Sequence, residues 1–326
     1  MTNALANDES PENRDAPPQA EISHHAEILT LLAYNAWLLP IPFAAQDKRV
    51  RELSRLLPGR DVIVLNEVFQ RRAQKNLLSA LAMAYPYTTP MLRHPGPWYR
   101  RGRMLFDGGV LILSRWPIIR TERCLYGGLL RGPDAWAAKG ISYACINKGG
   151  TPYHILATHT QASAEIPFRL ACRLLGRNAK SHYTALRARQ FERLADFVDD
   201  LAIPRSEAVV YAGDMNADAL SSPEEVDRML QTLDAALPGY SAAAWPREGI
   251  GSPPTYDPTQ NPLCEKGPPA FYDYILWSRR HRAPENAHLM VQRLRALGSW
   301  RRYALGRELR DLSDHHAIEA SFTFSS

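Results

Sequence analysis

Residues 312–322 read LSDHHAIEASF, in which Asp314, His315 and a second histidine stand directly before an alternation of apolar and polar residues. Ser-Asp before a strand is ordinary turn chemistry, and an isolated histidine at a strand end is usually structural. Histidine is also the side chain whose pKa best suits general base catalysis near neutral pH. The pair is therefore open to a structural and a catalytic interpretation, between which other residues must decide.

Several other polar residues stand at or near the ends of apolar runs, where side chains can converge on one edge of a folded sheet. Asn35 follows ILTLLAY, Glu67 lies within VLNEVF, and His159 ends YHILATH. An unpaired carboxylate is costly to bury, so Glu67 needs a cation or an arginine nearby. Mg²⁺ prefers oxygen ligands and often takes only one or two protein carboxylates. Glu67 suits a metal ligand and a salt bridge equally, and His159 taken alone is more typical of a structural histidine.

The segment GDMN supplies a carboxylate and an amide two positions apart, at Asp214 and Asn216. If strand geometry persists, both side chains point the same way, and the amide can donate to a phosphoryl oxygen. An Asx turn is the competing interpretation. In FYDYILWS, Asp273 stands between aromatic residues, where a buried carboxylate needs a partner. If Asp273 holds one ring nitrogen of His315, the other nitrogen is free to take a proton from water.

The elements that must position these residues belong to a chain of 326 residues with 45% hydrophobic content, enough for a large buried core. Continuous apolar runs predict strands, and apolar residues three or four apart predict helices. A mixture of helix-linked and directly linked strands favours an α/β sandwich of two packed sheets flanked by helices. The strand candidates are 28–35, 61–69, 108–114, 141–146, 153–159, 208–216, 271–278 and 316–322, and the helix candidates are 50–57, 70–84 and 186–201.

The charge balance and the first residues limit the class of protein. With 39 Lys and Arg against 34 Asp and Glu, the net charge of +5 is compatible with an anionic substrate or surface without requiring one. Residues 1–26 are polar and lack an apolar run, so we expect a disordered tail ahead of one catalytic domain over 27–326. They lack a secretory signal, and no stretch is apolar enough to cross a bilayer. The compartment stays open between the cytoplasm and export without a cleaved signal.

Seven short motifs follow one another along residues 28–323: AYNAWL, LNEVF, GGVLILSRWPI, ATHTQA, GDMNAD, YDYILWS and SDHHAI. In these motifs and their order, the chain resembles the endonuclease/exonuclease/phosphatase superfamily. Within it, the chain looks like the neutral sphingomyelinases, especially the bacterial type of sphingomyelin phosphodiesterase. LNEVF, the HTQA stretch at His159, AAKGISY with Lys139, and PTYDPTQNP carry this narrower resemblance.

The resemblance implies a DNase I-like four-layer α/β sandwich and Mg²⁺-dependent hydrolysis of a phosphodiester, with Mn²⁺ or Co²⁺ as substitute metals. Carried over by position, Glu67 is the principal metal ligand. Asn35 lies close to the metal or the phosphate, and Asp314 supports the metal end of the site. These three residues form the metal side of the expected site.

The same resemblance implies the catalytic roles. His315 is the general base that activates water, and Asp273 orients it. His159 and Asn216 stabilise the charge that builds on the phosphoryl oxygens. Asp214 orients the nucleophile or helps to protonate the leaving alkoxide. The Asp-His pair at the start of the last strand thus completes a rim of polar residues.

The leading functional hypothesis is an enzyme of the sphingomyelinase C type, a phospholipase C of lipid metabolism that releases a phosphorylated head group and leaves ceramide. A nuclease and an inositol or phosphomonoester phosphatase of the same superfamily are alternatives. A small net charge without a long basic stripe counts against nucleic acid as a partner. A catalytically silent lipid-binding module is the last alternative, although it has no need of the complete polar set. The oligomeric state stays open.

A lipid substrate also predicts contacts with a peripheral membrane surface. Phe168, Arg169 and Arg173 belong to SAEIPFRLACRLLGRNAKSHY, whose basic and apolar residues fit an amphipathic helix lying on lipid. An ordinary surface helix with its apolar stripe on the core is the competing and slightly favoured interpretation. Trp300, which stands among arginines, and Lys139 are the other candidates for contacts with substrate or lipid.

Overall fold

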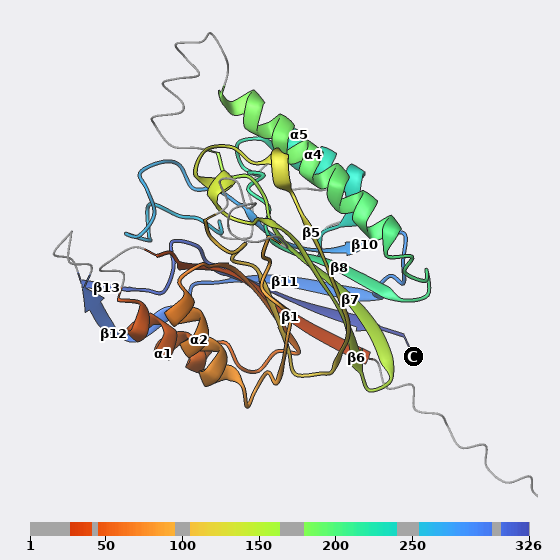
Figure 1. Cartoon of the computed structure of the whole chain (residues 1–326), viewed down its shortest axis with the longest axis horizontal. Helices are drawn as coiled ribbons and strands as arrows, with labels where there is room; N and C mark the ends of the chain where they lie inside the picture. The colour runs from red at the N-terminus through yellow and green to blue at the C-terminus, as the bar shows by residue number, and fades with distance from the viewer. Residues whose placement is uncertain are drawn as a thin grey trace, which may run out of the picture.

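The computed structural model describes residues 27–40, 45–94, 105–163, 179–239, 254–301 and 308–325. Within them, two six-stranded β-sheets pack face to face, and helices cover the outer face of each sheet (Figure 1). This is the four-layer α/β sandwich expected from the sequence. The expected tail over 1–26 lies outside the described residues.

The first sheet has the strand order β11-β14-β1-β2-β4-β3, and in it only β1 and β2 run parallel. Apolar residues on both faces of β1 are buried: Leu29 and Leu31 contact the core between the sheets, whereas Leu32 and Tyr34 contact the core under the helices. Burial on both faces explains the continuous apolar run in the sequence. The bounds are Glu27–Leu38 (β1), Val62–Val68 (β2), Tyr87–Thr88 (β3), Leu111–Ser114 (β4), Asn286–Gln292 (β11) and Ala317–Phe324 (β14).

The second sheet has the strand order β5-β6-β7-β8-β10-β9, and in it only β7 and β8 run parallel. Along β7, Tyr153 and Ile155 contact the core between the sheets, and Leu156 contacts the core under the second pair of helices. The bounds are Ile118–Leu125 (β5), Gly140–Lys148 (β6), Thr151–His159 (β7), Ala208–Asp214 (β8), Ala235–Ala236 (β9) and Asp273–Ser278 (β10).

Two pairs of helices form the outer layers. The first sheet is covered by α1 (Gln46–Leu56) and α2 (Arg71–Leu81), and the second by α4 (Ala179–Asp200) and α5 (Pro223–Leu233). A small sheet of β12 (Arg295–Arg301) and β13 (Glu308–Asp311) packs beside α1, and two 3-10 helices, η2 (Gly127–Leu129) and η3 (Gly132–Trp136), precede β6. Three apolar cores therefore separate the four layers.

Each strand candidate from the sequence overlaps a strand of the structure, and each helix candidate overlaps a helix. The elements that the sequence analysis missed include β5, β11, α5 and the β12–β13 pair. β5 and β11 are edge strands, and every second residue over 286–290 of β11 is exposed. An edge strand needs few apolar residues, so its sequence resembles a loop.

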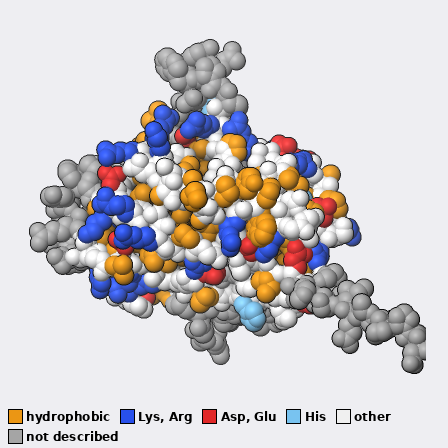
Figure 2. Space-filling view, turned by 90° about the horizontal axis from the view of Figure 1, so that it is seen from below, with side chains coloured by type: hydrophobic (Ala, Val, Ile, Leu, Met, Phe, Trp, Pro, Cys, Tyr) orange, Lys and Arg blue, Asp and Glu red, His pale blue; other side chains and the backbone are white. Residues whose placement is uncertain are grey.

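The outer surface mixes residue types. Figure 2 shows one face, on which hydrophobic side chains lie across the middle and Lys and Arg side chains gather toward one side. Among the described residues, no helix is long and apolar enough to span a membrane.

The strand registers bring the polar residues of both sheets to one rim. In the first sheet, Asn35 of β1 stands opposite Asn66 of β2. In the second, Asp214 of β8 stands between His159 of β7 and Asp273 of β10. Parallel pairing of β1 with β2 and of β7 with β8 places the C-terminal ends of neighbouring strands at the same edge of each sheet. The rim predicted from strand ends is thus a consequence of topology.

Candidate active site

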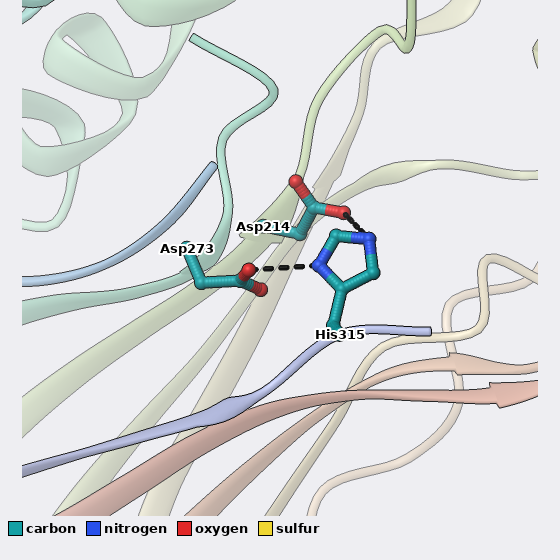
Figure 3. Close-up of side chains that lie close together, drawn as sticks. All are labelled: Asp214, Asp273 and His315. Atoms are coloured by element: carbon teal, nitrogen blue, oxygen red, sulfur yellow. Dashed lines mark hydrogen bonds and ion pairs between the residues drawn. The ribbon is translucent and has the colours of Figure 1, made fainter. Parts of the chain in front are cut away.

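His315 and Asp273 form a hydrogen-bonded pair at this rim (Figure 3). His315 Nδ1 donates to Asp273 Oδ2 over 2.8 Å, and Nε2 faces Asp214 Oδ2 at 3.9 Å. The backbone N–H of His315 donates to Ser313 Oγ over 3.2 Å, which fixes the turn before β14. A histidine held at one ring nitrogen by a carboxylate suits general base catalysis at the other nitrogen. The contact expected from the sequence is present, and its catalytic role stays a prediction.

Burial and mutual repulsion shift the pKa values of the acidic groups at the rim. Burial raises the pKa of Asp214 to about 6, and the neighbouring Asp273 acts in the same direction. Burial raises the pKa of Glu67 to about 7, and Asp314 adds to this effect. Burial alone would lower the pKa of His315, but Asp273 and the other carboxylates around it hold that pKa well above its usual range. The rim therefore favours added positive charge.

Glu67, near the end of β2, has one carboxylate oxygen without a protein partner. Its Oε2 is buried and accepts no hydrogen bond from any described residue, and its Oε1 lies 4.0 Å from His159 Nε2. The backbone of Glu67 has a left-handed φ of 57°, a conformation that non-glycine residues rarely adopt outside constrained sites. Burying an unpaired carboxylate oxygen is costly unless a cation neutralises it. The unpaired Oε2 of Glu67 therefore fits a divalent cation that prefers oxygen ligands.

Asn35 and Asp314 lie on either side of Ser313. Asn35 Nδ2 donates to Asp214 Oδ2 over 3.0 Å, and Asn35 Oδ1 accepts the N–H of Trp37 over 3.1 Å. Ser313 Oγ donates to Asn35 O over 2.6 Å and lies 3.1 Å from Asp314 Oδ1. The side-chain oxygen of Asn35 retains a second lone pair, so Asn35 is compatible with its expected place close to a metal or phosphate.

A second grouping of ligand atoms also exists at the rim. One ligand atom each of Asp214, Asp273 and His315 lie within 4.8 Å of one another. The hydrogen bond between Asp273 and His315 already uses one atom from each of these two residues. The side of the rim at Glu67 is therefore the better candidate for the metal.

His159 is buried between a lysine and two carboxylates. Its Nε2 lies 3.2 Å from Lys139 Nζ and 3.5 Å from Asp214 Oδ2. Burial lowers the pKa of His159 well below its usual range, and Lys139 acts in the same direction, so the ring is neutral. Lys139 Nζ also pairs with Asp134 Oδ1 at 2.7 Å, and only 1% of Lys139 is exposed. Lys139 therefore lies beneath the rim, where it contacts His159, and is unable to meet a lipid surface.

In the GDMN segment, Asp214 forms an Asx turn with Asn216 and also presents a carboxylate oxygen to the site. Asp214 Oδ1 accepts the N–H of Asn216 over 3.1 Å, which is the hydrogen bond of an Asx turn. Asn216 has a φ of 49°, and its Nδ2 donates to Thr160 O over 3.3 Å. Asp214 Oδ2 meanwhile faces the ring of His315. The turn thus uses one oxygen of Asp214 and leaves the other at the site.

Asn66, which the sequence analysis passed over, joins the two sheets beneath the site. Its Nδ2 donates to Thr158 O, and its Oδ1 accepts the N–H of Asp214, each over 3.0 Å. The neighbouring Gly213 has a φ of 133°, and a Cβ atom there would lie 2.1 Å from Thr158 O. Only glycine allows this approach. An amide inside a buried apolar run was the available signal, because buried polar groups require partners.

Arg49 of α1 is a second residue that the sequence analysis missed. Its guanidinium is fully buried, donates to Leu312 O and to two carbonyl oxygens at the end of β1, and lies 5.1 Å from the ring centroid of Trp37. Leu312 stands three residues before His315. Arg49 therefore connects α1, the end of β1 and the turn that carries the candidate base.

The structure describes only one of the other residues expected to contact lipid, Trp300. Trp300 is only 2% exposed, and its Nε1 donates to Asp311 O over 3.0 Å within the core under α1. The expectation that Trp300 contacts lipid is wrong, because an indole packed in a core has no face for a membrane. Phe168, Arg169 and Arg173 lie outside the described residues.

Comparison with known proteins places this geometry in a family. A family model described as the Endonuclease/Exonuclease/phosphatase family matches residues 32–315, which include the rim from Asn35 to His315. The chain belongs to the endonuclease/exonuclease/phosphatase family. Among curated members, it is similar to sphingomyelinase C of Leptospira interrogans, with 30% identity over 308 residues that cover 89% of this chain and 51% of that protein. The chain thus spans about half the length of this relative.

Solved structures of similar proteins share the fold. Sphingomyelinase C from Streptomyces griseocarneus is 29% identical and has a TM-score of 0.74 over 91% of this chain and 99% of that chain. A mutant beta toxin from Staphylococcus aureus, with bound magnesium ions, is 29% identical and has a TM-score of 0.75 over 90% of this chain and 99% of that one. The expected DNase I-like sandwich is confirmed, and the family provides a precedent for magnesium.

Proposed function

We propose that this protein is a Mg²⁺-dependent phosphodiesterase of the sphingomyelinase C type, which hydrolyses sphingomyelin or a related phospholipid to ceramide and a phosphorylated head group. The observation that carries the proposal is the pair of His315 and Asp273 at the same rim as the unpartnered oxygen of Glu67. One group suits the acceptance of a proton and the other the binding of a cation. Similarity to proteins named sphingomyelinase C, over 89% and 91% of this chain, supports the substrate class.

Phosphodiester hydrolysis needs the phosphate charge to be neutralised. When bound, Mg²⁺ supplies positive charge that stabilises the negative charge on the phosphoryl oxygens. Glu67 would hold the ion, with Asn35 and Asp314 on the same side of the rim. The side chains of His159 and Asn216 stabilise the negative charge on the phosphoryl oxygens. Asn216 has two amide hydrogens, of which the bond to Thr160 uses one.

His315 acts as the base in this proposal. Its Nε2 takes a proton from the attacking water, while Asp273 fixes the ring and stabilises the positive charge that forms on it. The carboxylates that raise the pKa of His315 thereby make it a stronger base. Asp214, whose pKa of about 6 keeps it partly protonated near neutral pH, is suited to give a proton to the leaving alkoxide of ceramide.

A panel of substrates tests this function. The purified protein is incubated with sphingomyelin, phosphatidylcholine, plasmid DNA and an inositol phosphate, each with Mg²⁺ and with EDTA. We expect Mg²⁺-dependent release of phosphocholine from sphingomyelin, and no release with EDTA. Preferred turnover of DNA or of the inositol phosphate would replace the proposal by a nuclease or a phosphomonoesterase. Turnover of none of the four would favour a silent lipid-binding module.

A further inference from the structure

Three large apolar side chains are exposed on two adjoining segments that lead to the candidate active site. Leu105 is 70% exposed, Phe106 39% and Trp136 48%. The backbone N–H groups of Leu105 and Phe106 both donate to Trp136 O, over 2.6 and 2.9 Å, so the two segments adjoin. Adjacent exposed apolar side chains indicate an interaction surface. We call Leu105, Phe106 and Trp136 the rim patch.

Trp136 is tied to the buried cation that contacts His159. It ends η3, three residues before Lys139, whose Nζ lies 3.2 Å from His159 Nε2. Between them, the N–H of Ala138 donates to Phe106 O over 3.0 Å. The indole is therefore carried on a short segment whose other end lies beneath the active site.

The segment that carries Leu105 and Phe106 leads to the metal side of the rim. Three residues after Phe106, Gly109 accepts the N–H of Val68 over 3.0 Å, and Val68 directly follows Glu67. A Cβ atom at Gly108 would lie 2.3 Å from Ala138 O, so the two segments are pressed together. Backbone contacts thus connect the rim patch to both sides of the candidate site.

The charged groups within these two segments are paired. Asp107 forms an ion pair with Arg93 at 3.1 Å, and Asp134 forms one with Lys139 at 2.7 Å. The charged side chains of residues 105–109 and 132–139 are therefore neutralised in pairs, and Leu105, Phe106 and Trp136 present apolar groups. A zwitterionic lipid surface offers a matching apolar layer beneath neutral head groups. Tryptophan in particular favours the boundary between head groups and acyl chains.

We propose that Leu105, Phe106 and Trp136 insert into a zwitterionic lipid surface and hold the active site over a substrate molecule that remains in that surface. This inference rests on the proposed function, because a lipid substrate has to be reached at the aggregate that contains it. The rim patch takes the role in lipid contact that the sequence analysis had expected of Trp300, which is buried. The sequence analysis did not single out the three residues of the patch. Lipid binding and hydrolysis then occur at adjacent but separate groups of residues.

The test compares lipid binding with chemistry in the triple variant Leu105→Ser, Phe106→Ser, Trp136→Ser. Binding to sucrose-loaded vesicles of sphingomyelin and phosphatidylcholine is measured by sedimentation. We expect affinity for vesicles to fall about tenfold or more, because affinity follows the apolar area that is inserted. Hydrolysis of sphingomyelin in vesicles should fall in parallel. Hydrolysis of a short-chain, monomeric sphingomyelin should be unchanged, which also shows that the variant is folded.

The double variant Met83→Ser, Ile119→Ser is the matched control. These side chains are 97% and 60% exposed. Ile119 lies in the half of β5 that pairs with the far end of β6, away from Gly140 and the site. The control should bind vesicles like the parent.

Three outcomes would overturn the rim patch: unchanged vesicle binding in the triple variant, equal loss of hydrolysis with vesicles and with the monomeric substrate, or altered self-association in place of altered vesicle binding. A parent protein that binds vesicles through the patch but cleaves no phospholipid would refute the proposed function and leave the patch standing.

Discussion

At the scale of single residues, the site depends on polar groups whose protonation is set by their neighbours. Burial raises the pKa values of Asp214 and Glu67, and neighbouring carboxylates add to that rise. Carboxylates around His315 outweigh its burial and raise its pKa, which gives it a strong affinity for a proton. His159 differs, because burial beside Lys139 keeps it neutral. Two histidines lie beside one carboxylate, that of Asp214, and the proposal gives them different tasks: His315 acts as the base, and His159 stabilises the charge on the phosphoryl oxygens.

Replacing the candidate base tests its role. His315→Ala should lower kcat for a soluble phosphodiester about 10²- to 10⁴-fold, the usual contribution of a general base. Asp273→Asn should also lower kcat, because an amide does not stabilise the charged ring. Steady-state kinetics with Mg²⁺ measures both. His288→Ala, on the exposed face of the edge strand β11, is the control and should keep the parental rate. Parental kcat in His315→Ala would refute the assignment of the base.

Part of the candidate site is accessible to sequence reasoning at this scale, and part is not. Glu67, Asp214 and Asp273 were found because polar residues inside or at the end of apolar runs must have a reason to be there. Asn66 stood in the same kind of run, but its partner, the carbonyl of Thr158, is 92 residues away in the chain. Arg49 looked like any charged residue of a helix, because its burial depends on residues from other elements, the end of β1 and Leu312 among them.

At the scale of elements, buried polar contacts fix the segments that carry the site. Arg49 saturates carbonyl oxygens at the end of β1 and at Leu312. Asp61 has a similar role at the start of β2, where it binds Thr30, Trp116 and Lys148. Apolar strands such as β1 and β2 could be recognised from the sequence, whereas the polar contacts that hold their ends could not, because each depends on residues from other elements.

Arg49→Met should destabilise the protein by about 2–4 kcal/mol, because it removes several hydrogen bonds and leaves buried carbonyl groups without donors. Urea denaturation followed by circular dichroism measures the free energy of unfolding. Arg51→Met changes an exposed residue of the same helix and should leave the free energy of unfolding nearly unchanged. A stability equal to that of the parent would show that the Arg49 contacts contribute nothing net.

Asp61 gives a prediction about acid stability. Burial tends to raise its pKa, but the hydrogen bonds from Lys148 and Trp116 outweigh burial and lower it below the usual value. A carboxyl group with a lower pKa in the folded state contributes its full stability above the unfolded pKa, near 4. That contribution is lost as the pH falls through the folded pKa. The parent should therefore lose more stability than Asp61→Asn between pH 6 and pH 3.

The two proteins are compared by thermal unfolding at each pH. Asp47→Asn, which alters a half-exposed residue of α1, serves as the control and should follow the parent. Identical pH profiles of the parent and Asp61→Asn would contradict the role of Asp61.

At the scale of the whole molecule, the site exists because two sheets meet. Asn35 and Glu67 come from the first sheet, whereas His159, Asp214 and Asp273 come from the second, and His315 lies before β14 of the first. Asn66 connects the two sheets directly. The sandwich class could be predicted because strands buried on both faces have a distinctive sequence. The edge strands β5 and β11 could not, since exposed strands resemble loops.

Binding of a divalent cation at this rim is the central claim, and anomalous diffraction from crystals grown with Mn²⁺ tests it most directly. We predict one anomalous peak bonded to Glu67 at about 2.1 Å, the length of a bond between oxygen and a small divalent cation. The hydrogen bond between His315 and Asp273 should remain intact. A peak bridging Asp214, Asp273 and His315 with that bond broken, or no peak beside Glu67, would contradict the account.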